Sequence, residues 1–268
     1  MTALKTLLQG KLTTKELSLV PRAFDQVGSI AIFSEFPNEL AKKEKLIGTA
    51  LLQLNPSIKT VAKKTSIHEG KYRTKKIRTI TGEKTQITEH KESGVRVLVN
   101  IETCYFSPRL SHERLRIAKL VKKGEQILVL FSGVGVYPLI LAKHSKASQI
   151  VGVETNPKAH QYALQNLTLN KTMNIELFKI DAKKFTSTKK FDRIILPLPG
   201  SAEQYFNVVK KVAKKGAIIH FYDFQHEGEF DNAKEEIKKV FSKAKILRIV
   251  KAGMYSSRKW RICVDFRL

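Results

Sequence analysis

The stretch from Ile127 to Ala142, ILVLFSGVGVYPLILA, narrows the possible folds of this chain more than any other segment. An apolar, strand-like run leads into Gly133 and Gly135 and continues directly as an apolar, helix-like pattern. Glycines in such a turn let the backbone approach a ligand closely, and the start of the following helix presents free N–H groups and a positive dipole end. The pattern is typical of a nucleotide-binding turn, with an ordinary buried strand and tight turn as the alternative.

Three later strand ends carry residues that suit the same kind of site. Glu154 ends the run 150–153, nineteen positions after Gly135, where an acid can accept hydrogen bonds from two ribose hydroxyls. Asp181 follows the next expected strand, where its carboxylate can accept from an adenine amino group or simply cap a helix, and the segment 197–199 follows the fourth. Ligands of open parallel sheets bind at the carboxyl ends of the strands. We therefore expect these residues to face one crevice.

Strands and helices alternate from Pro108 onward, which predicts a parallel sheet covered by helices. Asn156-Pro157 is a strong helix start, because Asn caps the helix and Pro suits its first turn. The expected strands are 126–130, 150–154, 174–179, 193–196, 217–221, 244–250 and 261–267. The expected helices lie near 108–121, 135–145, 157–169, 201–214 and 231–243. Seven strands that close with an antiparallel pair distinguish a methyltransferase-type sheet from that of a dinucleotide dehydrogenase.

The first hundred residues have a different pattern of apolar runs and turn residues, which predicts a smaller α+β module. We expect a helix near the start, a short strand at 30–33, and a helix over 38–54. Short strands separated by turns should follow and form a small antiparallel sheet; they are 77–81, 85–89 and 95–99. The predicted organisation is an α+β RNA-binding or substrate-positioning domain over 1–104 and a Rossmann-like α/β domain over 105–268.

The charge of the chain indicates a polyanionic partner. It has 49 Lys and Arg against 24 Asp and Glu, a formal net charge of +25. Nucleic acid is a better candidate than a membrane because no strongly apolar segment reaches about 18 residues. A lysine-rich proteome is the alternative explanation.

The cysteines and the N-terminus point to a reducing, cytoplasmic compartment. Cys104 and Cys263 lie far apart, outside any CxxC or Cys/His cluster, so we expect neither a disulfide framework nor a metal site. The N-terminal segment has early charges within its apolar pattern and resembles an amphipathic helix more than a signal peptide.

A longer set of motifs resembles a known family. The run YFSPRLSHER, residues 105–114, is followed by FSGVG, VETNP and DRIILPLPGSAE. Together they resemble the archaeal and eukaryotic tRNA (guanine-37 N1)-methyltransferase family over roughly residues 65–268, and the first run is the most specific. The resemblance implies a class I S-adenosylmethionine-dependent enzyme that methylates the guanine 3′ of the tRNA anticodon, with the anticodon stem-loop as its partner.

The resemblance also implies roles for individual residues. The family's general base falls on Glu113, its arginine over the target guanine on Arg73, and its aromatic residue near the methyl-transfer site on Tyr105. The implied cofactor-binding residues are Arg114, Phe131, Gly133, Gly135, Glu154, Thr155, Asp181, Ala182, Pro197, Leu198 and Pro199, with Arg114 at the methionine end. The expected RNA-binding residues are Lys71, Lys75, Lys76, Arg78 and Arg109.

These assignments agree with the chemistry of guanine. Its N1 carries a proton near neutral pH, so a carboxylate such as that of Glu113 must take the proton as N1 attacks the methyl group. Negative charge then grows on O6, where Arg73 can stabilise it. The base must leave its stack to be reached, which is easiest in a single-stranded loop. The alternatives are a helix-dipole role for Glu113, a phosphate contact for Arg73 and core packing for Tyr105.

Two features depart from the family pattern. Most relatives carry Asn-Leu-Pro where this chain has Pro197-Leu198-Pro199, so the guanine must be positioned differently. This change resembles an archaeal branch that also methylates carbon 7 of 4-demethylwyosine, giving isowyosine. Many archaeal relatives also have an additional N-terminal domain that contacts the tRNA elbow, and this chain is expected to begin after it.

Other classes of function fit the sequence less well. An N6-adenine methyltransferase would need an Asp/Asn-Pro-Pro-aromatic motif at the fourth strand, a cytosine-C5 enzyme would need a cysteine there, and a dehydrogenase would have a third glycine where Leu139 stands. Two alternatives stay open. They are a wybutosine-pathway relative that transfers an aminocarboxypropyl group from the same cofactor, and a non-catalytic tRNA-binding protein.

Overall fold

The computed structural model describes residues 3–66 and 70–268. The chain divides into two compact units. Unit 1 consists of Met1–Lys91 and Arg96–Pro108, and unit 2 of Glu92–Val95 and Arg109–Leu268. Each unit has its own apolar core.

Unit 1 is built on a four-stranded sheet in the order β1-β2-β3-β4, in which only β2 and β3 are parallel. Its elements are α1 (Ala3–Leu7), α2 (Thr14–Leu19), β1 (Asp25–Val27), β2 (Ile30–Phe33), η1 (Asn38–Lys43), α3 (Glu44–Leu54), β3 (Thr60–Lys64) and β4 (Ile77–Gly82). The core contains Phe33, Ile47 and Val61. The helix expected over 38–54 is divided into a 3₁₀ segment and α3.

A two-stranded hairpin follows, formed by β5 (Ile87–Glu92) and β6 (Val95–Asn100). Ser93 and Gly94 form its turn with φ of 45° and 75°, which is the positive-φ geometry that two-residue hairpins favour. The expected small antiparallel sheet is therefore wrong in two respects. β4 pairs with β3 in the four-stranded sheet, and the strand placed at 85–89 begins at Ile87.

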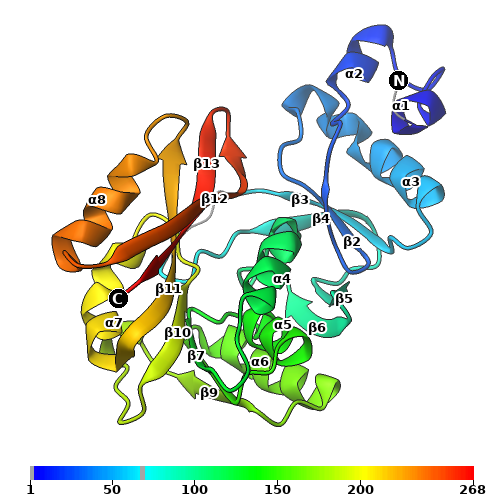
Figure 1. Cartoon of the computed structure of the whole chain (residues 1–268). Helices are drawn as coiled ribbons and strands as arrows, with labels where there is room; N and C mark the ends of the chain where they lie inside the picture. Colours follow the sequence, from blue (N-terminus) through cyan, green and yellow to red (C-terminus); the bar gives the residue numbers. More distant parts are fainter. Residues whose placement is uncertain (1–2, 67–69) are drawn as a thin grey trace. The chain divides into compact units, whose positions relative to one another are not determined.

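Unit 2 is an α/β layer structure on a seven-stranded sheet in the order β12-β13-β11-β10-β7-β8-β9. Strands β11, β10, β7, β8 and β9 are parallel, and β13 is antiparallel to both of its neighbours. Figure 1 shows α4, α5 and α6 on one side of this sheet and α7 and α8 on the other. The strands are β7 (Gln126–Leu130), β8 (Gln149–Glu154), β9 (Ile175–Lys179), β10 (Phe191–Leu196), β11 (Ala213–His226), β12 (Lys245–Ser256) and β13 (Lys259–Arg267). The helices are η2 (Pro108–Leu110), α4 (Ser111–Lys119), α5 (Val136–His144), α6 (Pro157–Asn170), η3 (Ala182–Lys184), η4 (Ala202–Tyr205), α7 (Phe206–Val212) and α8 (Asp231–Val240).

The fold class, a methyltransferase-type sheet with a smaller N-terminal α+β part, is confirmed. The main difference lies at the helix expected over 201–214, which ends at Val212 because β11 starts at Ala213. From Phe191 to Arg193 β10 advances by two positions, whereas β11 advances by five, from Ala213 to Ile218, so its extra residues form a bulge.

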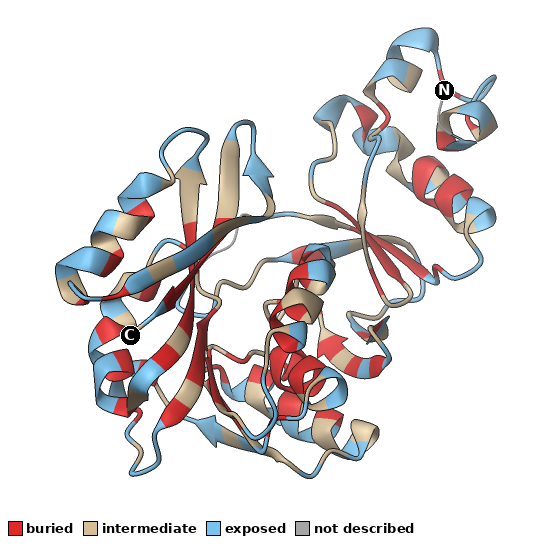
Figure 2. Cartoon of the chain, viewed as in Figure 1, coloured by how far each residue is buried: buried red, intermediate tan, exposed pale blue. Residues whose placement is uncertain are grey.

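The core of unit 2 lies on both faces of the central strands. Leu128, Val151 and Ile194 alternate with residues of the opposite face, and Phe206 contacts the rings of Phe221 and Phe241. Figure 2 shows that buried residues follow β7, β10 and β11, whereas the outer helix faces are exposed. Within the described ranges, no helix combines the length and the apolar character needed to span a bilayer.

Candidate active site

The carboxyl ends of four adjacent parallel strands bring the expected cofactor-binding residues of unit 2 to one edge of the sheet. β10, β7, β8 and β9 pair in this order, and each ends immediately before one of the segments singled out from the sequence. This edge is where open α/β sheets bind ligands.

The turn between β7 and α5 has an unusual backbone. Phe131, Gly133 and Gly135 have φ of 60°, 57° and 83°, so every second residue of the turn is in the left-handed region. A Cβ on Gly135 would come within 3.3 Å of the Cβ of Ala163 in α6, which leaves little room for a side chain. Among the described residues, the buried hydroxyl of Ser132 has no hydrogen-bond partner. A polar ligand at this turn would satisfy it.

Glu154 connects this turn with the start of α6. Its carboxylate accepts from the backbone N–H of Gly133 at 2.8 Å and from that of Asn156 at 2.7 Å. Burial raises the pKa of Glu154, and these backbone hydrogen bonds, with one from Thr155, oppose the rise. Asn156 in turn caps α6 by accepting from the N–H of Lys158 at 3.0 Å. The acid is therefore fixed where ribose hydroxyls could donate to it.

The ends of β9 and β10 carry the other expected cofactor-binding residues of the sheet edge. Asp181 caps η3 by accepting from the N–H of Lys183 at 3.0 Å, which is the structural role considered as its alternative, and Ala182 beside it is buried. After β10, Pro197 and Leu198 are partly buried and Pro199 is buried. The residues of this edge fit an adenosine-containing cofactor, since they include an acid suited to ribose hydroxyls, the unpartnered hydroxyl of Ser132, a glycine turn and an apolar wall.

The proposed base Glu113 lies in the first turn of α4 and is buried in unit 2. Its Oε2 accepts from Nε of Arg116 at 2.7 Å, and its Oε1 accepts from Nη2 of Arg116 at 2.8 Å and from the hydroxyl of Tyr222 at 2.5 Å. The hydroxyl of Tyr137 lies 2.7 Å from that of Tyr222. Burial raises the pKa of both tyrosines, so both remain neutral donors.

Arg116 also binds a second carboxylate, that of Asp265 on β13, at 2.7 Å. Asp265 accepts from Nδ1 of His220 at 2.6 Å and from the thiol of Cys263 at 3.3 Å. Burial acts to raise the pKa of Asp265, but the hydrogen bonds from His220 and Arg116 outweigh it and lower that pKa. Glu113 and Asp265 therefore share one partly buried guanidinium.

The tautomer of His220 follows from its neighbours. Its Nε2 lies 2.7 Å from Nη1 of Arg193, which can only donate, so Nε2 accepts and the proton is on Nδ1. Burial lowers the pKa of His220, which is consistent with a neutral ring. Arg193 is itself paired with Glu125 at 2.7 Å. The potential metal-ligating atoms of His220, Cys263 and Asp265 lie within 4.8 Å of one another. In this structure these residues are joined by hydrogen bonds, with Asp265 as the acceptor.

Sequence reasoning missed most of this network. Arg116 had a local signal, since it follows Glu113 by three residues on the same helix face. Tyr222 and Asp265 had a weaker one, as polar residues inside the otherwise apolar strands β11 and β13. Nothing in the sequence pairs Arg116 with a residue 149 positions away.

Arg114 has a partner that the sequence did not indicate. Its Nε donates to Oε1 of Glu92 at 2.6 Å and its Nη2 to Oε2 at 2.5 Å, and each side chain is only 3% exposed. This buried pair fixes the hairpin turn to α4 within unit 2. Contact of Arg114 with the cofactor remains a prediction.

Most of the expected substrate residues of unit 1 lie between Lys71 and Arg78, in a turn before β4 and at its start, whereas Tyr105 follows β6. Arg73 has φ of 51° and its N–H donates to the carbonyl of Gly70 at 3.1 Å. Arg78 forms an ion pair with Glu44 at 2.5 Å, so its charge is partly neutralised within unit 1. Tyr105 is partly buried. The other expected RNA contacts are Lys71 and Lys76, which are exposed, Lys75, which is partly buried, and Arg109 at the start of unit 2, which is exposed.

Comparison with known proteins identifies the family. Residues 88–250 match the TRM5/TYW2 methyltransferase domain and residues 4–85 the TYW2 N-terminal domain. Trm5b of Pyrococcus abyssi, a tRNA (guanine(37)-N(1))-methyltransferase, is 35% identical over 93% of this chain and 76% of its own length. Taw22 of Nanoarchaeum equitans, a tRNA (guanine(37)-N(1))/4-demethylwyosine(37)-methyltransferase, is 29% identical over 92% of this chain and 99% of its own.

A third relative and a solved structure complete the comparison. The tRNA(Phe) (4-demethylwyosine(37)-C(7)) aminocarboxypropyltransferase of Pyrococcus horikoshii is 25% identical over 99% of this chain and 96% of its own length. The solved complex of aTrm5 and tRNALeu superposes with a TM-score of 0.88 at 27% identity, over all of this chain and 78% of that one. The chain thus belongs to the TRM5/TYW2 methyltransferase family.

Proposed function

We propose that this chain transfers the methyl group of S-adenosylmethionine to N1 of the guanosine at position 37 of tRNA. The observation that supports the reaction best is the environment of Glu113. Its side chain is buried, and its carboxylate is oriented by hydrogen bonds from Arg116 and Tyr222. Among the described residues, Oε2 accepts from Arg116 alone, which leaves it a lone pair for the N1 proton of guanine.

The cofactor supplies an electrophilic methyl group, and the residues of the sheet edge would hold it. Glu154 would accept from the ribose hydroxyls, and Gly133 and Gly135 would let the backbone approach. Asp181, on the neighbouring strand end, would accept from the adenine amino group.

Asp265 has a defined part in this proposal. When Glu113 takes the proton it becomes neutral, and the partly buried Arg116 loses one of its two counter-charges. The carboxylate of Asp265, 2.7 Å from Nη1 of Arg116, keeps that charge compensated throughout. Arg73 is proposed to stabilise the negative charge that grows on O6, and Tyr105 to pack near the transferred methyl group.

Nucleoside mass spectrometry tests the activity directly. Incubated with the cofactor, the chain should form N1-methylguanosine in a tRNA transcript with guanine at position 37 and none in the same transcript with adenine there. Glu113→Gln should reduce turnover by at least about a hundredfold with little change in cofactor affinity. Glu229→Gln, which alters an exposed acid, is the matched control. Unchanged turnover of Glu113→Gln rejects its role as base.

A second activity is supported by the segment after β10. Pro197 stands where the resemblance implies an asparagine, so it lacks an amide side chain and a backbone donor, and a relative with both activities aligns with nearly the full chain. We propose that the same site methylates carbon 7 of 4-demethylwyosine. Reaction with tRNA that carries this base tests it, and the product mass distinguishes a methyl group from an aminocarboxypropyl group. We infer a cytoplasmic location from the tRNA substrate and from Cys104 and Cys263, which form no disulfide among the described residues.

A further inference from the structure

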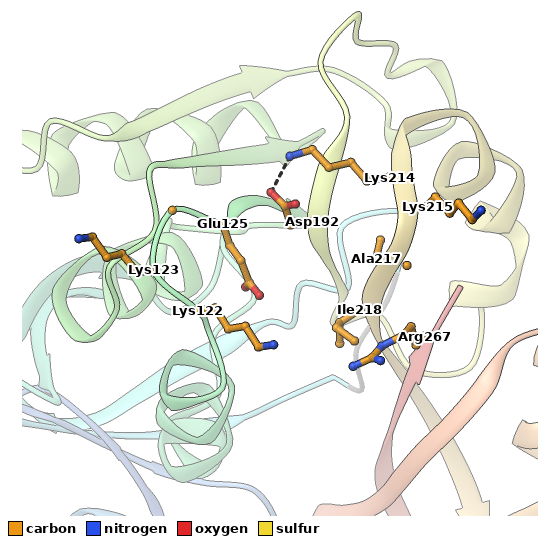
Figure 3. Close-up of a pocket in the computed structure, with 11 residues that line it drawn as sticks. Lys122, Lys123, Glu125, Asp192, Lys214, Lys215, Ala217, Ile218 and Arg267 are labelled. Carbon is orange, nitrogen blue, oxygen red and sulfur yellow. Dashed lines mark hydrogen bonds and ion pairs between the residues drawn. The ribbon is translucent and has the colours of Figure 1, made fainter.

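A basic pocket opens at the amino end of the large sheet, on the edge opposite the expected cofactor site. It has a volume of about 480 Å³ and lies entirely in unit 2. Figure 3 shows Lys122 and Lys123 on one side of it and Lys214, Lys215 and Arg267 on the other. Its lining residues are Lys122, Lys123, Gly124, Glu125, Asp192, Lys214, Lys215, Gly216, Ala217, Ile218 and Arg267.

Local backbone features produce this pocket. The bulge at the start of β11 carries Lys214 and Lys215, and the turn before β7 carries Lys122 and Lys123. Each pair of lysines is followed by a glycine with positive φ, 84° at Gly124 and 78° at Gly216. Arg267 comes from the end of β13, which is antiparallel to β11 and so ends at the same edge.

The two acids of the pocket are already neutralised. Asp192 accepts from Lys214 at 2.8 Å, as Figure 3 marks, and Glu125 pairs with Arg193 at 2.7 Å. Within residues 3–66 and 70–268, the other four cations, Lys122, Lys123, Lys215 and Arg267, form no ion pair and are exposed. Four like charges gathered in this way repel one another unless an anion binds between them.

Exposed lysines also occur along the rest of this amino edge. The turns that lead into β8, β9 and β10 carry exposed lysines, namely Lys146, Lys171 and Lys190. Of the turns at the opposite edge, 131–135, 155–157 and 197–201 contain neither Lys nor Arg, whereas the turn after β9 carries Lys183 and Lys184. The cofactor is expected at that opposite edge, so the lysines of the amino edge are not needed to bind it.

We propose that this amino-edge pocket binds backbone phosphates of the substrate tRNA, as a contact separate from the one that holds the target base. The inference rests on the proposed tRNA substrate. β7 has five residues, so at about 3.3 Å per residue the two edges are only about 17 Å apart there. One RNA with a charge on every nucleotide can reach both. Closely spaced flexible lysines around an open pocket suit phosphate groups without reading sequence.

Charge reversal within unit 2 tests the proposal. The double variant Lys122→Glu/Lys215→Glu is compared with Lys234→Glu/Lys239→Glu, which changes the same number of lysines on α8. The pocket variant should raise the Kd for a tRNA transcript about tenfold or more relative to the α8 variant, and it should reduce the slope of log Kd against log salt by about two. Cofactor affinity and turnover at saturating tRNA should match those of the wild type.

The outcomes separate the two proposals. Equal tRNA affinity and equal salt slopes in the pocket and α8 variants would overturn the amino-edge contact. Failure of the wild-type chain to methylate guanine 37 would instead overturn the proposed function. A wild type that methylates tRNA, with a pocket variant that needs more tRNA to reach the same turnover, supports both.

Discussion

Glu154, a proposed cofactor-binding residue, lowers the stability of the fold at neutral pH. Burial raises its pKa despite hydrogen bonds from Gly133 and Asn156. An acid whose pKa is higher in the folded chain than in the unfolded one binds its proton more tightly when folded. Its contribution to the free energy of unfolding therefore falls as the pH rises from below its ordinary pKa, and at neutral pH the ionised group is a net cost. A group maintained at such a cost, at the edge where ligands bind, is a strong candidate for function.

We expect a corresponding pH dependence of cofactor binding. Only the ionised carboxylate can accept from both ribose hydroxyls, so affinity should weaken on acidification, and it should do so at a higher pH than an ordinary glutamate would cause. Calorimetric titration between about pH 5 and about pH 8 measures this. Glu154→Gln should bind more weakly and lose this pH-dependent part. Identical pH profiles for variant and wild type would contradict the assignment.

Tyr222 is expected to act on catalysis through Glu113. Tyr222→Phe removes the 2.5 Å hydrogen bond to Oε1 and also leaves the hydroxyl of Tyr137 without its partner. If the poorer orientation of Glu113 raises the activation free energy by about 1.4 kcal/mol, kcat falls roughly tenfold. The KM for tRNA and the affinity for cofactor should change little. Steady-state kinetics measures the effect, with Tyr255→Phe, at a tyrosine that is 60% exposed, as the control. Equal kcat for both variants would remove Tyr222 from the proposal.

These residues also mark what the sequence could and could not predict. The sequence singled out Glu113 through a motif that resembles the family, and Glu154 through its position at the end of an apolar run. It did not single out Tyr222 and Asp265, because a buried network joins β11 and β13 to α4 through side chains far apart in the chain. Periodicity identifies the strands that carry them but not which polar residues face each other.

The same contrast holds for the strands and helices. The strands β7, β8 and β10 were predicted almost to the residue because they are apolar runs ended by Gly, Asn-Pro or Pro. β1 has only three residues, and β3 includes two lysines, so neither gave a strand signal. β11 begins four residues earlier than expected because its bulge is polar and lacks alternation.

The hairpin formed by β5 and β6 offers a matched test of two ion pairs. Glu92 binds Arg114 with both side chains 3% exposed, whereas Glu89 binds Arg96 with side chains 29% and 53% exposed. Glu92→Gln leaves a buried guanidinium without its counter-charge and should lower the free energy of unfolding by about 3–5 kcal/mol. Glu89→Gln should cost at most about 1 kcal/mol, because water screens the exposed pair. Urea unfolding followed by circular dichroism compares them, and similar losses would mean that burial does not govern these pairs.

The net charge of +25 acts on tRNA binding as a property of the entire chain. Phosphate contacts release counterions and do not read bases, so they set affinity and its salt dependence without selecting position 37. In the proposed mechanism, selection then depends on the site around Glu113, which can act only on a base with an N1 proton to lose. Affinity and specificity should therefore be separable in this protein.

A tRNA transcript with adenine at position 37 provides the test. It should not be methylated, yet it should bind within a few-fold of the guanine-37 transcript and compete with it, with a slope of log Kd against log salt that matches within error. Competition kinetics and filter binding at several salt concentrations measure both properties. A transcript that neither binds nor inhibits would show that recognition of the base supplies most of the affinity. The excess of lysine and arginine would then have to serve another purpose.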